Sequence, residues 1–315
     1  MKFNHELIYR GNVGNAPLIA LSKPFDRHIF ARISQMSKTF DRQRGAGGDM
    51  VGSERRGTGL RRKRSKKGEQ KMDRIILFAG TIGQALITYF TATVVHEGGH
   101  VLAGLIQGWR FDMMVVGPFK LYRAEDGKVK LGIEKDTSLW GGVGGTLPPA
   151  KSEKRMKQYA AILLAGPLAS VILGAVFTLI WLFVNRGVFF MLMAFVPIGM
   201  GIACMIPGVK TGILYNDGTR FSRIRKGGQT AAEEEAIFDA ATLRLFDNDT
   251  PYDENGIEVM TASKDAEIRY LGHYYGYLNA KQANDSEKEQ SRLDCMKAIE
   301  DKVPSFIKTI CVISE

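Results

Sequence analysis

Three long apolar runs most constrain the fold of this 315-residue chain. They cover residues 75–95, 160–184 and 188–207, and none contains a charged side chain. An α-helix needs about 20 apolar residues to cross a bilayer, at roughly 1.5 Å of rise per residue. Any one run fits a helix buried in a soluble core, but three in one chain favour the membrane. The sequence therefore predicts three membrane-spanning helices, with the short turn at 185–187 making the last two an antiparallel hairpin.

The formal charge of +10 is concentrated at the N-terminus, because residues 74–315 carry equal numbers of basic and acidic side chains. The cluster at 61–67 supplies six of the basic residues, and glycine-rich stretches interrupt any helical pattern before it. We therefore expect residues 1–71 to form a basic, disordered arm. No aromatic platform or recognition fold accompanies the cluster, so we expect no nucleic-acid partner.

Residues 72–219 hold the apolar runs and one region with strand character. Strand-like stretches within residues 109–135 flank turn signals at Gly117-Pro118 and Asp126-Gly127, which predicts β-hairpins between the first two spans. We interpret the glycine-rich stretch 141–145 as a flexible connector, because its glycines are too loosely spaced for a phosphate-binding loop.

Residues 220–315 are polar and carry apolar residues at helical spacing, which predicts a soluble helical domain. The predicted helices cover residues 231–246, 262–279 and 286–299. Tyr270, Tyr274 and Tyr277 share one helix face, as core residues do. Paired helices of this size often bind peptides, so we expect a protein partner here. The predicted fold is mainly α: a polytopic membrane protein with a three-helix transmembrane catalytic core, a β-hairpin insertion and this C-terminal domain.

The five residues His96-Glu97-Gly98-Gly99-His100 lie at the end of the first apolar run. Positions i and i+4 of a helix share a face, so His96 and His100 can offer two nitrogens to one zinc ion. Glu97 then lies beside the metal, where its carboxylate can take a proton from zinc-bound water and later return it.

A histidine on an apolar face is usually a buried core residue, and this is the alternative interpretation of His96 and His100. Two histidines and a glutamate near hydrocarbon are costly without partners or a metal, which favours a zinc site. The three cysteines, Cys204, Cys295 and Cys311, are far apart in sequence and predict neither a disulfide framework nor a thiolate zinc site.

A catalytic zinc needs three protein ligands and one open position, so the motif requires a partner elsewhere in the chain. Asp217 is the best candidate, because it follows the third apolar run and Gly218 permits close backbone approach. The tripeptide Asn-Asp-Gly is also a common turn. The residues alone leave both interpretations open.

With these motifs in place, the chain resembles the site-2 protease family of intramembrane zinc metalloproteases. The resemblance rests on residues 96–100, on Ala165-Gly166-Pro167 in the second run and on Asp217-Gly218 after the third, within residues 74–226. It implies that His96, His100 and Asp217 bind one zinc ion and that Glu97 is the acid/base. It also implies that the 109–135 hairpins guide an extended substrate by strand addition.

The chain departs from the family's usual pattern at three places. Ser170 stands where many members have Asn, Cys204 lies three residues before Pro207 in place of the usual Asn, and Asn216 replaces Leu before Asp-Gly. These changes leave the implied zinc ligands intact and affect the residues that align substrate.

The function that these observations favour is zinc-dependent hydrolysis of peptide bonds in membrane-anchored protein or peptide substrates. The alternative is a non-catalytic scaffold or peptide-binding protein of the same fold, although such a protein has no physical need for Glu97. A metal transporter is a weaker alternative, because the second and third runs contain no histidine or carboxylate to line a path.

Basic residues give two conflicting signals for membrane orientation. The N-terminal arm favours a cytoplasmic N-terminus. The opposite flank carries Lys151, Lys154, Arg155, Lys157, Arg220, Arg223, Arg225 and Lys226. If translation starts at Met72, the second set decides. We expect a multi-pass protein of a bacterial cytoplasmic membrane, with the lipid bilayer as partner and the C-terminal domain in the cytoplasm.

Overall fold

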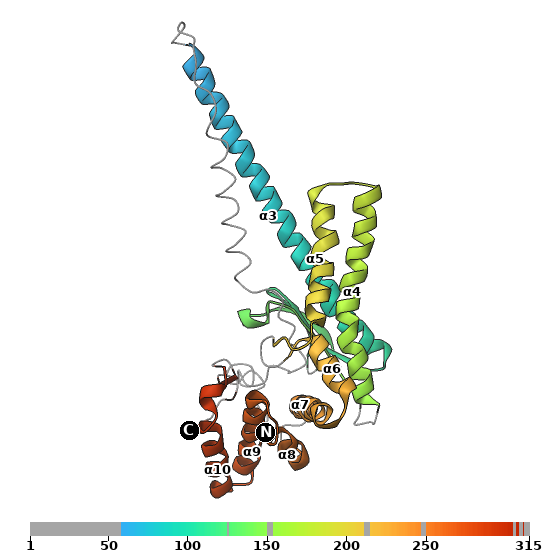
Figure 1. Cartoon of the computed structure of the whole chain (residues 1–315), viewed down its shortest axis with the longest axis vertical. Helices are drawn as coiled ribbons and strands as arrows, with labels where there is room; N and C mark the ends of the chain where they lie inside the picture. The colour runs from blue at the N-terminus through green and yellow to red at the C-terminus, as the bar shows by residue number, and fades with distance from the viewer. Residues whose placement is uncertain are drawn as a thin grey trace.

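The computed structural model describes residues 58–124, 126–149, 154–210, 215–246, 250–304, 307–308 and 311. The described residues include three long helices. In Figure 1 a small sheet lies beside their lower ends, and a group of shorter helices lies beneath. Of the predicted arm, residues 1–57 lie outside the described residues. Residues 58–71 are helical rather than disordered, because the first described helix already begins at Thr58.

The three long helices are α3 (Thr58–Ile106), α4 (Arg155–Phe183) and α5 (Val188–Met205). In α3 the part from Met72 to Ile106 is long and apolar enough to cross a membrane, and α4 and α5 are so over their whole lengths. The prediction of three candidate spanning helices is confirmed. The first is longer than predicted, since it continues past the histidine motif.

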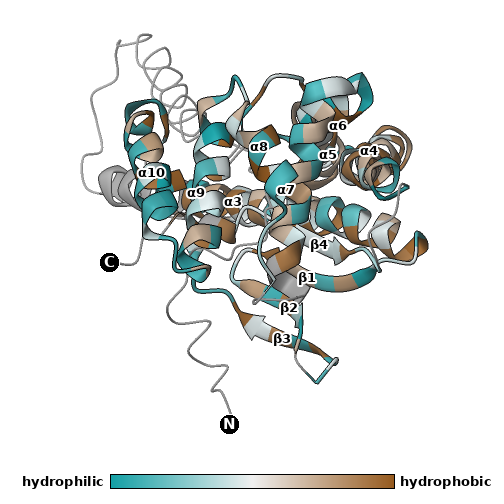
Figure 2. Cartoon of the chain, turned by 90° about the horizontal axis from the view of Figure 1, so that it is seen from below, coloured by the Kyte–Doolittle hydropathy of each residue, from teal (hydrophilic) through white to brown (hydrophobic). Residues whose placement is uncertain are grey.

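Large apolar side chains cover the outside of these helices. Leu77 of α3 is 72% exposed and Phe183 of α4 is 80% exposed. Figure 2 shows α4 mostly brown, as an apolar element, and α10 mostly teal. An apolar surface of this extent is unfavourable in water and favourable in hydrocarbon. The exposed faces of the three helices therefore fit a lipid environment.

A four-stranded antiparallel sheet connects α3 to α4. Its strands are β1 (Arg110–Val116), β2 (Phe119–Arg123), β3 (Val129–Ile133) and β4 (Val143–Leu147), in the order β3-β2-β1-β4. The predicted turns are present: Gly117 and Gly127 have φ of +56° and +75°, which glycine adopts without steric cost.

The prediction of a flexible connector at residues 141–145 is wrong. Residues 143–147 form β4, which pairs with β1 from Val115↔Val143 to Arg110↔Leu147. All five residues of β4 are buried. Glycine has poor strand propensity, so the local sequence hides this strand. Its glycines serve a close approach to α3, described below.

The β2–β3 hairpin has one apolar face that is open to the surroundings. The side chains of this face alternate along the two strands: Phe119, Leu121, Val129, Leu131 and Ile133. Leu131 is 70% exposed, and the ring of Phe119 contacts that of Phe90 in α3 at 5.8 Å between centroids. Because Phe90 lies within the first spanning helix, the hairpin begins beside the apolar part of the molecule.

Among the described residues, five α-helices follow the third span. They are α6 (Asp217–Lys226), α7 (Gly228–Phe246), α8 (Glu254–Thr261), α9 (Ala266–Gln282) and α10 (Ser286–Lys297). The sequence predicted α7, α9 and α10 with shifted ends, and it missed α6 and α8. Helix α9 begins at Ala266 because the Asp265 side chain accepts a hydrogen bond from the Glu267 N–H.

Helices α7 to α10 share an apolar core that contains Tyr270, and Tyr274 packs against it partly buried. Tyr277 is buried as well but lies outside this cluster, so the predicted core face is confirmed in part. A second cluster joins α7 to the membrane helices, because Phe238 of α7 packs against Tyr159 of α4 and Trp109. The Tyr159 and Phe238 rings are 4.7 Å apart between centroids. The C-terminal helices are thus packed directly against the end of the spanning bundle.

Candidate metal centre

Helix α3 presents His96 and His100 on the face that packs against α4. Their rings are 5.0 Å apart between centroids, and the two residues are 2% and 6% exposed. The i, i+4 spacing in a continuous helix produces this pairing. The structure therefore places the two histidines of the motif as the sequence predicted.

Each imidazole is oriented through its Nδ1 atom by a group of α4. The Nδ1 of His100 lies 2.7 Å from the carbonyl oxygen of Ile162, and that of His96 lies 3.0 Å from the Ser170 hydroxyl. A carbonyl oxygen only accepts, so His100 Nδ1 donates, and in the neutral ring Nε2 carries the lone pair. This is the tautomer that a metal-binding histidine needs at Nε2.

Asp217 approaches the same point from the start of α6. Its Oδ2 lies 3.4 Å from the Nε2 of His96 and 3.5 Å from the Nε2 of His100. Burial raises the pKa of Asp217, but the two imidazoles lower it more, so the net shift is downward and favours the carboxylate. Among the described residues, this is the group of His, Cys, Asp or Glu side chains that could hold a metal ion.

Asn216 fixes the position of Asp217 by joining two helices. Its side-chain oxygen accepts from the Thr219 N–H and caps α6, while its Nδ2 donates to the carbonyl of Ile206 at 2.8 Å, at the end of α5. The turn interpretation of Asn-Asp-Gly is thus wrong, since these residues begin a helix. Capping satisfies backbone groups that each helix end would otherwise leave unpaired.

Glycines allow the helices to meet closely around the three side chains. A Cβ at Gly218 would lie 2.4 Å from the Met205 carbonyl oxygen, and one at Gly166 would lie 2.2 Å from the Nε2 of His100. At Gly99 the added atom would lie 2.7 Å from the Ala165 carbonyl oxygen. No side chain larger than hydrogen fits these positions without movement.

Glu97 lies between α3 and the edge strand β4, and it is 2% exposed. A Cβ at Gly142 would lie 2.5 Å from its Oε1, and one at Gly144 would lie 2.7 Å from its backbone carbonyl oxygen. The backbone of this glycine-rich segment therefore lines the Glu97 carboxylate. The stretch interpreted as a connector is part of the candidate site.

A cluster of ion pairs lies one turn further along α6. Arg220 donates from Nε to Glu234 of α7 at 3.0 Å, and Arg223 donates to Glu234 at 2.7 Å. Burial lowers the pKa of Arg220, but nearby acidic groups, including Tyr159, Glu234 and Asp217, raise it more, so the net shift is upward. The guanidinium is a permanent charge buried beside the candidate metal ligand.

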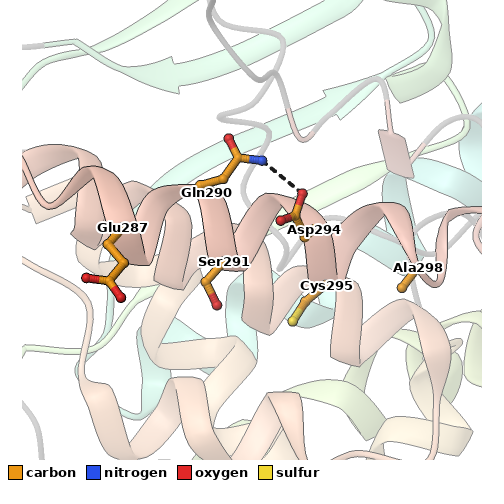
Figure 3. Close-up of a pocket in the computed structure, with 6 residues that line it drawn as sticks. All are labelled: Glu287, Gln290, Ser291, Asp294, Cys295 and Ala298. Atoms are coloured by element: carbon orange, nitrogen blue, oxygen red, sulfur yellow. Dashed lines mark hydrogen bonds between the residues drawn. The ribbon is translucent and has the colours of Figure 1, made fainter.

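A shallow depression on α10 does not adjoin these residues (Figure 3). Figure 3 shows side chains of one α10 face around it: Glu287, Gln290, Ser291, Asp294, Cys295 and Ala298. Of α10 only Met296 is buried, so no buried charged group faces the depression. It does not compete with the His-His-Asp group as a site.

Sequence reasoning missed several supporting residues of the site. The Asn216 cap had a signal, because Asn is a preferred N-cap residue and the acidic Asp217 follows it in the first turn. The pairing of Arg220 with Glu234 and the lining by Gly142 and Gly144 had none. They depend on contacts between segments that are distant in the chain.

Comparison with known proteins gives one result. The family model described as peptidase family M50 matches residues 84–315, which include the three candidate ligands, Glu97 and the C-terminal helices. No curated protein and no solved structure matches the chain. The resemblance that the sequence motifs indicated is confirmed by the family match.

Proposed function

Because the chain belongs to peptidase family M50, the site-2 protease family, we propose that it is a zinc-dependent intramembrane endopeptidase. Its substrates are membrane-associated proteins or peptides, and its metal ligands are His96, His100 and Asp217. The observation that carries the proposal is the convergence of three buried donor atoms from α3 and α6 on one point.

The spacing of the donor atoms suits zinc. Bonds from zinc to nitrogen and oxygen are about 2.0–2.1 Å, which in a tetrahedron sets donor atoms about 3.3 Å apart. The separations between Asp217 and the two histidines are 3.4 and 3.5 Å. Among the described residues, Nε2 of His96 and Oδ2 of Asp217 are buried without a hydrogen-bond partner. A cation would satisfy both atoms.

Glu97 is placed for proton transfer rather than for binding metal. It is outside the group of three donor atoms, yet it follows His96 directly in α3 and is buried like it. When bound, zinc supplies Lewis acidity, which polarises a carbonyl and acidifies a water. Glu97 accepts the proton of the attacking water and then protonates the leaving amine.

The edge strand β4 supports a route for substrate. It is at one end of the described sheet, and the backbone of Gly144 in the strand and of Gly142 just before it lines Glu97. A substrate segment unwound from its helix exposes backbone groups that an edge strand can pair with. The substrate therefore adds to β4, rather than to the 109–135 hairpins. N-methylation of alternate substrate amides should block cleavage in one register only; equal cleavage of both peptides contradicts strand addition.

The apolar hairpin face and the basic residues support a membrane orientation. The exposed side chains of β2 and β3 continue the apolar surface of α3, so the hairpin contacts lipid. Arg155 and the basic residues of α6 lie at one end of the bundle, which the positive-inside rule assigns to a bacterial cytoplasm. A labelling reagent that cannot cross membranes should reach Cys295 only in inverted vesicles.

The decisive experiment is metal content in detergent-purified full-length protein. We expect about one zinc per chain, since one His-His-Asp group forms one site. Asp217→Ala should lose it, whereas the matched control Asp253→Ala, which removes an exposed carboxylate at the start of α8, should keep it. Absence of zinc from the unchanged protein would support the alternative, a non-catalytic scaffold of the same fold.

A further inference from the structure

Glu234 of α7 is a buried carboxylate with two arginine partners. Its side chain is fully buried, and it accepts from Arg220 through Oε2 at 3.0 Å and from Arg223 through Oε1 at 2.7 Å. Both arginines belong to α6, the helix that begins with Asp217. Glu234 therefore compensates the positive charges of two arginines on α6, the helix that also carries Asp217.

Arg220 is the partner closest to that ligand along the helix. It lies three residues after Asp217, so both side chains occupy one face of α6. Its side chain is 4% exposed, and its guanidinium rests over the Tyr159 ring at 5.1 Å from the centroid. A guanidinium cannot lose its proton at physiological pH. Such a buried charge must be paired with a carboxylate.

Two carboxylates act on Arg220, those of Glu234 and Asp217. Of these two carboxylates, that of Glu234 accepts a direct hydrogen bond from Arg220 at 3.0 Å. If Glu234 lost its charge, Asp217 would be the remaining carboxylate on the same helix face. A salt bridge to Asp217 would then compete with a metal for Oδ2.

We propose that Glu234 is a positioning residue for the metal centre: by engaging Arg220, it keeps the guanidinium from pairing with Asp217 and so leaves the Asp217 carboxylate to the metal. This inference rests on the proposed function, because Asp217 is there a zinc ligand. Arg223 supports the arrangement by holding the second oxygen of Glu234.

The competing explanation is that the pair merely clamps α6 to α7. Breaking the pair from either side then has the same effect on the site. Competition for Asp217 predicts an asymmetry instead. Glu234→Gln leaves the cation without its carboxylate, whereas Arg220→Met removes the competitor and leaves Glu234 paired with Arg223.

The test measures zinc affinity of the full-length protein in detergent, by competition with a chromophoric chelator. Glu234→Gln should weaken zinc binding about 10–100-fold, the usual cost of losing a residue that supports a metal ligand. The zinc affinity of Arg220→Met should stay within about threefold of that of the unchanged protein. This substitution removes a positive charge and leaves no cation to pair with Asp217. The double variant Arg220→Met/Glu234→Gln should recover the affinity that Glu234→Gln loses.

Glu233→Gln is the matched control, because Glu233 is the neighbouring carboxylate and pairs with Arg223 instead. It should bind zinc like the unchanged protein. Equal weakening in Glu234→Gln and Arg220→Met, or no weakening in Glu234→Gln, overturns the inference while the zinc site stands. If Glu234→Gln does not fold, weakened binding in Arg220→Met alone overturns it. No zinc in the unchanged protein defeats the proposed function itself, and this inference with it.

Discussion

Two buried polar clusters lie one helical turn apart on α6, and they satisfy their charges in opposite ways. Around Arg220, guanidinium and carboxylate groups meet in direct hydrogen bonds of 2.7–3.0 Å. Around Asp217, two buried atoms lack a hydrogen-bond partner among the described residues. A completed network stabilises an arrangement, whereas an incomplete one is costly unless a ligand completes it. The comparison separates residues that stabilise the structure from residues that could bind a metal ion.

The strongest way to sharpen this comparison is Glu97→Gln. The substitution keeps the shape of the side chain and removes the base, so cleavage of a membrane substrate should fall about 10²–10⁴-fold, the range for general acid–base catalysis. Zinc content and thermal unfolding should not change, because Glu97 is not among the three donors. Metal-dependent cleavage at the unchanged rate in this variant rules out Glu97 as the base.

Ser170→Ala tests a residue that contacts one of the candidate metal ligands and is not a ligand itself. The hydroxyl orients His96 through Nδ1 at 3.0 Å. Its loss should weaken zinc binding about tenfold, near the lower end for such supporting groups. Chelator competition measures the affinity. Ser263→Ala, in the buried turn before α9, is the control and should leave zinc affinity unchanged; an equal loss in both variants means that Ser170 has no specific role.

Arg155→Met breaks an ion-pair cluster that contains none of the candidate ligands. Arg155 donates to Glu235 at 2.7 Å and to Asp239 at 2.6 Å, which ties α4 to α7. Its partners are partly exposed, so water can replace the arginine. The free energy of unfolding, measured in denaturant, should fall by about 1–2 kcal/mol, and the zinc affinity should not change. If Arg155→Met lost zinc without losing stability, this ion-pair cluster would serve the metal site rather than the stability of the fold.

The smallest expected effect is at Asp265, which accepts from Tyr215 and pairs with Lys210. Burial raises the pKa of Asp265, but the hydrogen bond from Tyr215 and the pairing with Lys210 lower it more. A carboxyl group whose pKa is lowered by folding stabilises the fold at pH values above its unfolded pKa of about 3.9. This stabilisation is lost as the pH falls below that value and through the folded pKa. Asp265→Asn should therefore be less stable at neutral pH by under about 1 kcal/mol, and the difference should vanish in acid. A difference that grows in acid contradicts this sign.

Local patterns in the sequence predicted the spanning helices and the motif residues. Charge-free runs require a membrane or a large core, and the His96–His100 spacing depends only on helix geometry. The structure also brings Asp217 to the two histidines, which the family resemblance implied and the residues alone did not decide. These features need no knowledge of how distant segments pack.

The features that escaped prediction depend on partners far away in the chain. Gly144 and Gly145 have weak strand propensity, yet β4 forms because it pairs with β1 and packs against α3. Glu234 looks like part of a solvated acidic run until α6 places two arginines beside it. Helix α8 is too short for its apolar spacing to distinguish it from a loop.

The junction between α5 and α6 has a mechanical consequence. Gly218 lets the backbone of α6 touch the last turn of α5, and the Asn216 side chain ties the same two ends together. The end of the third span and Asp217 are therefore held together and move together. If α5 tilts to admit a substrate sideways from lipid, the carboxylate must swing with it. A change in the tilt of α5 and a change in the distance from Asp217 to His96 and His100 are then a single degree of freedom.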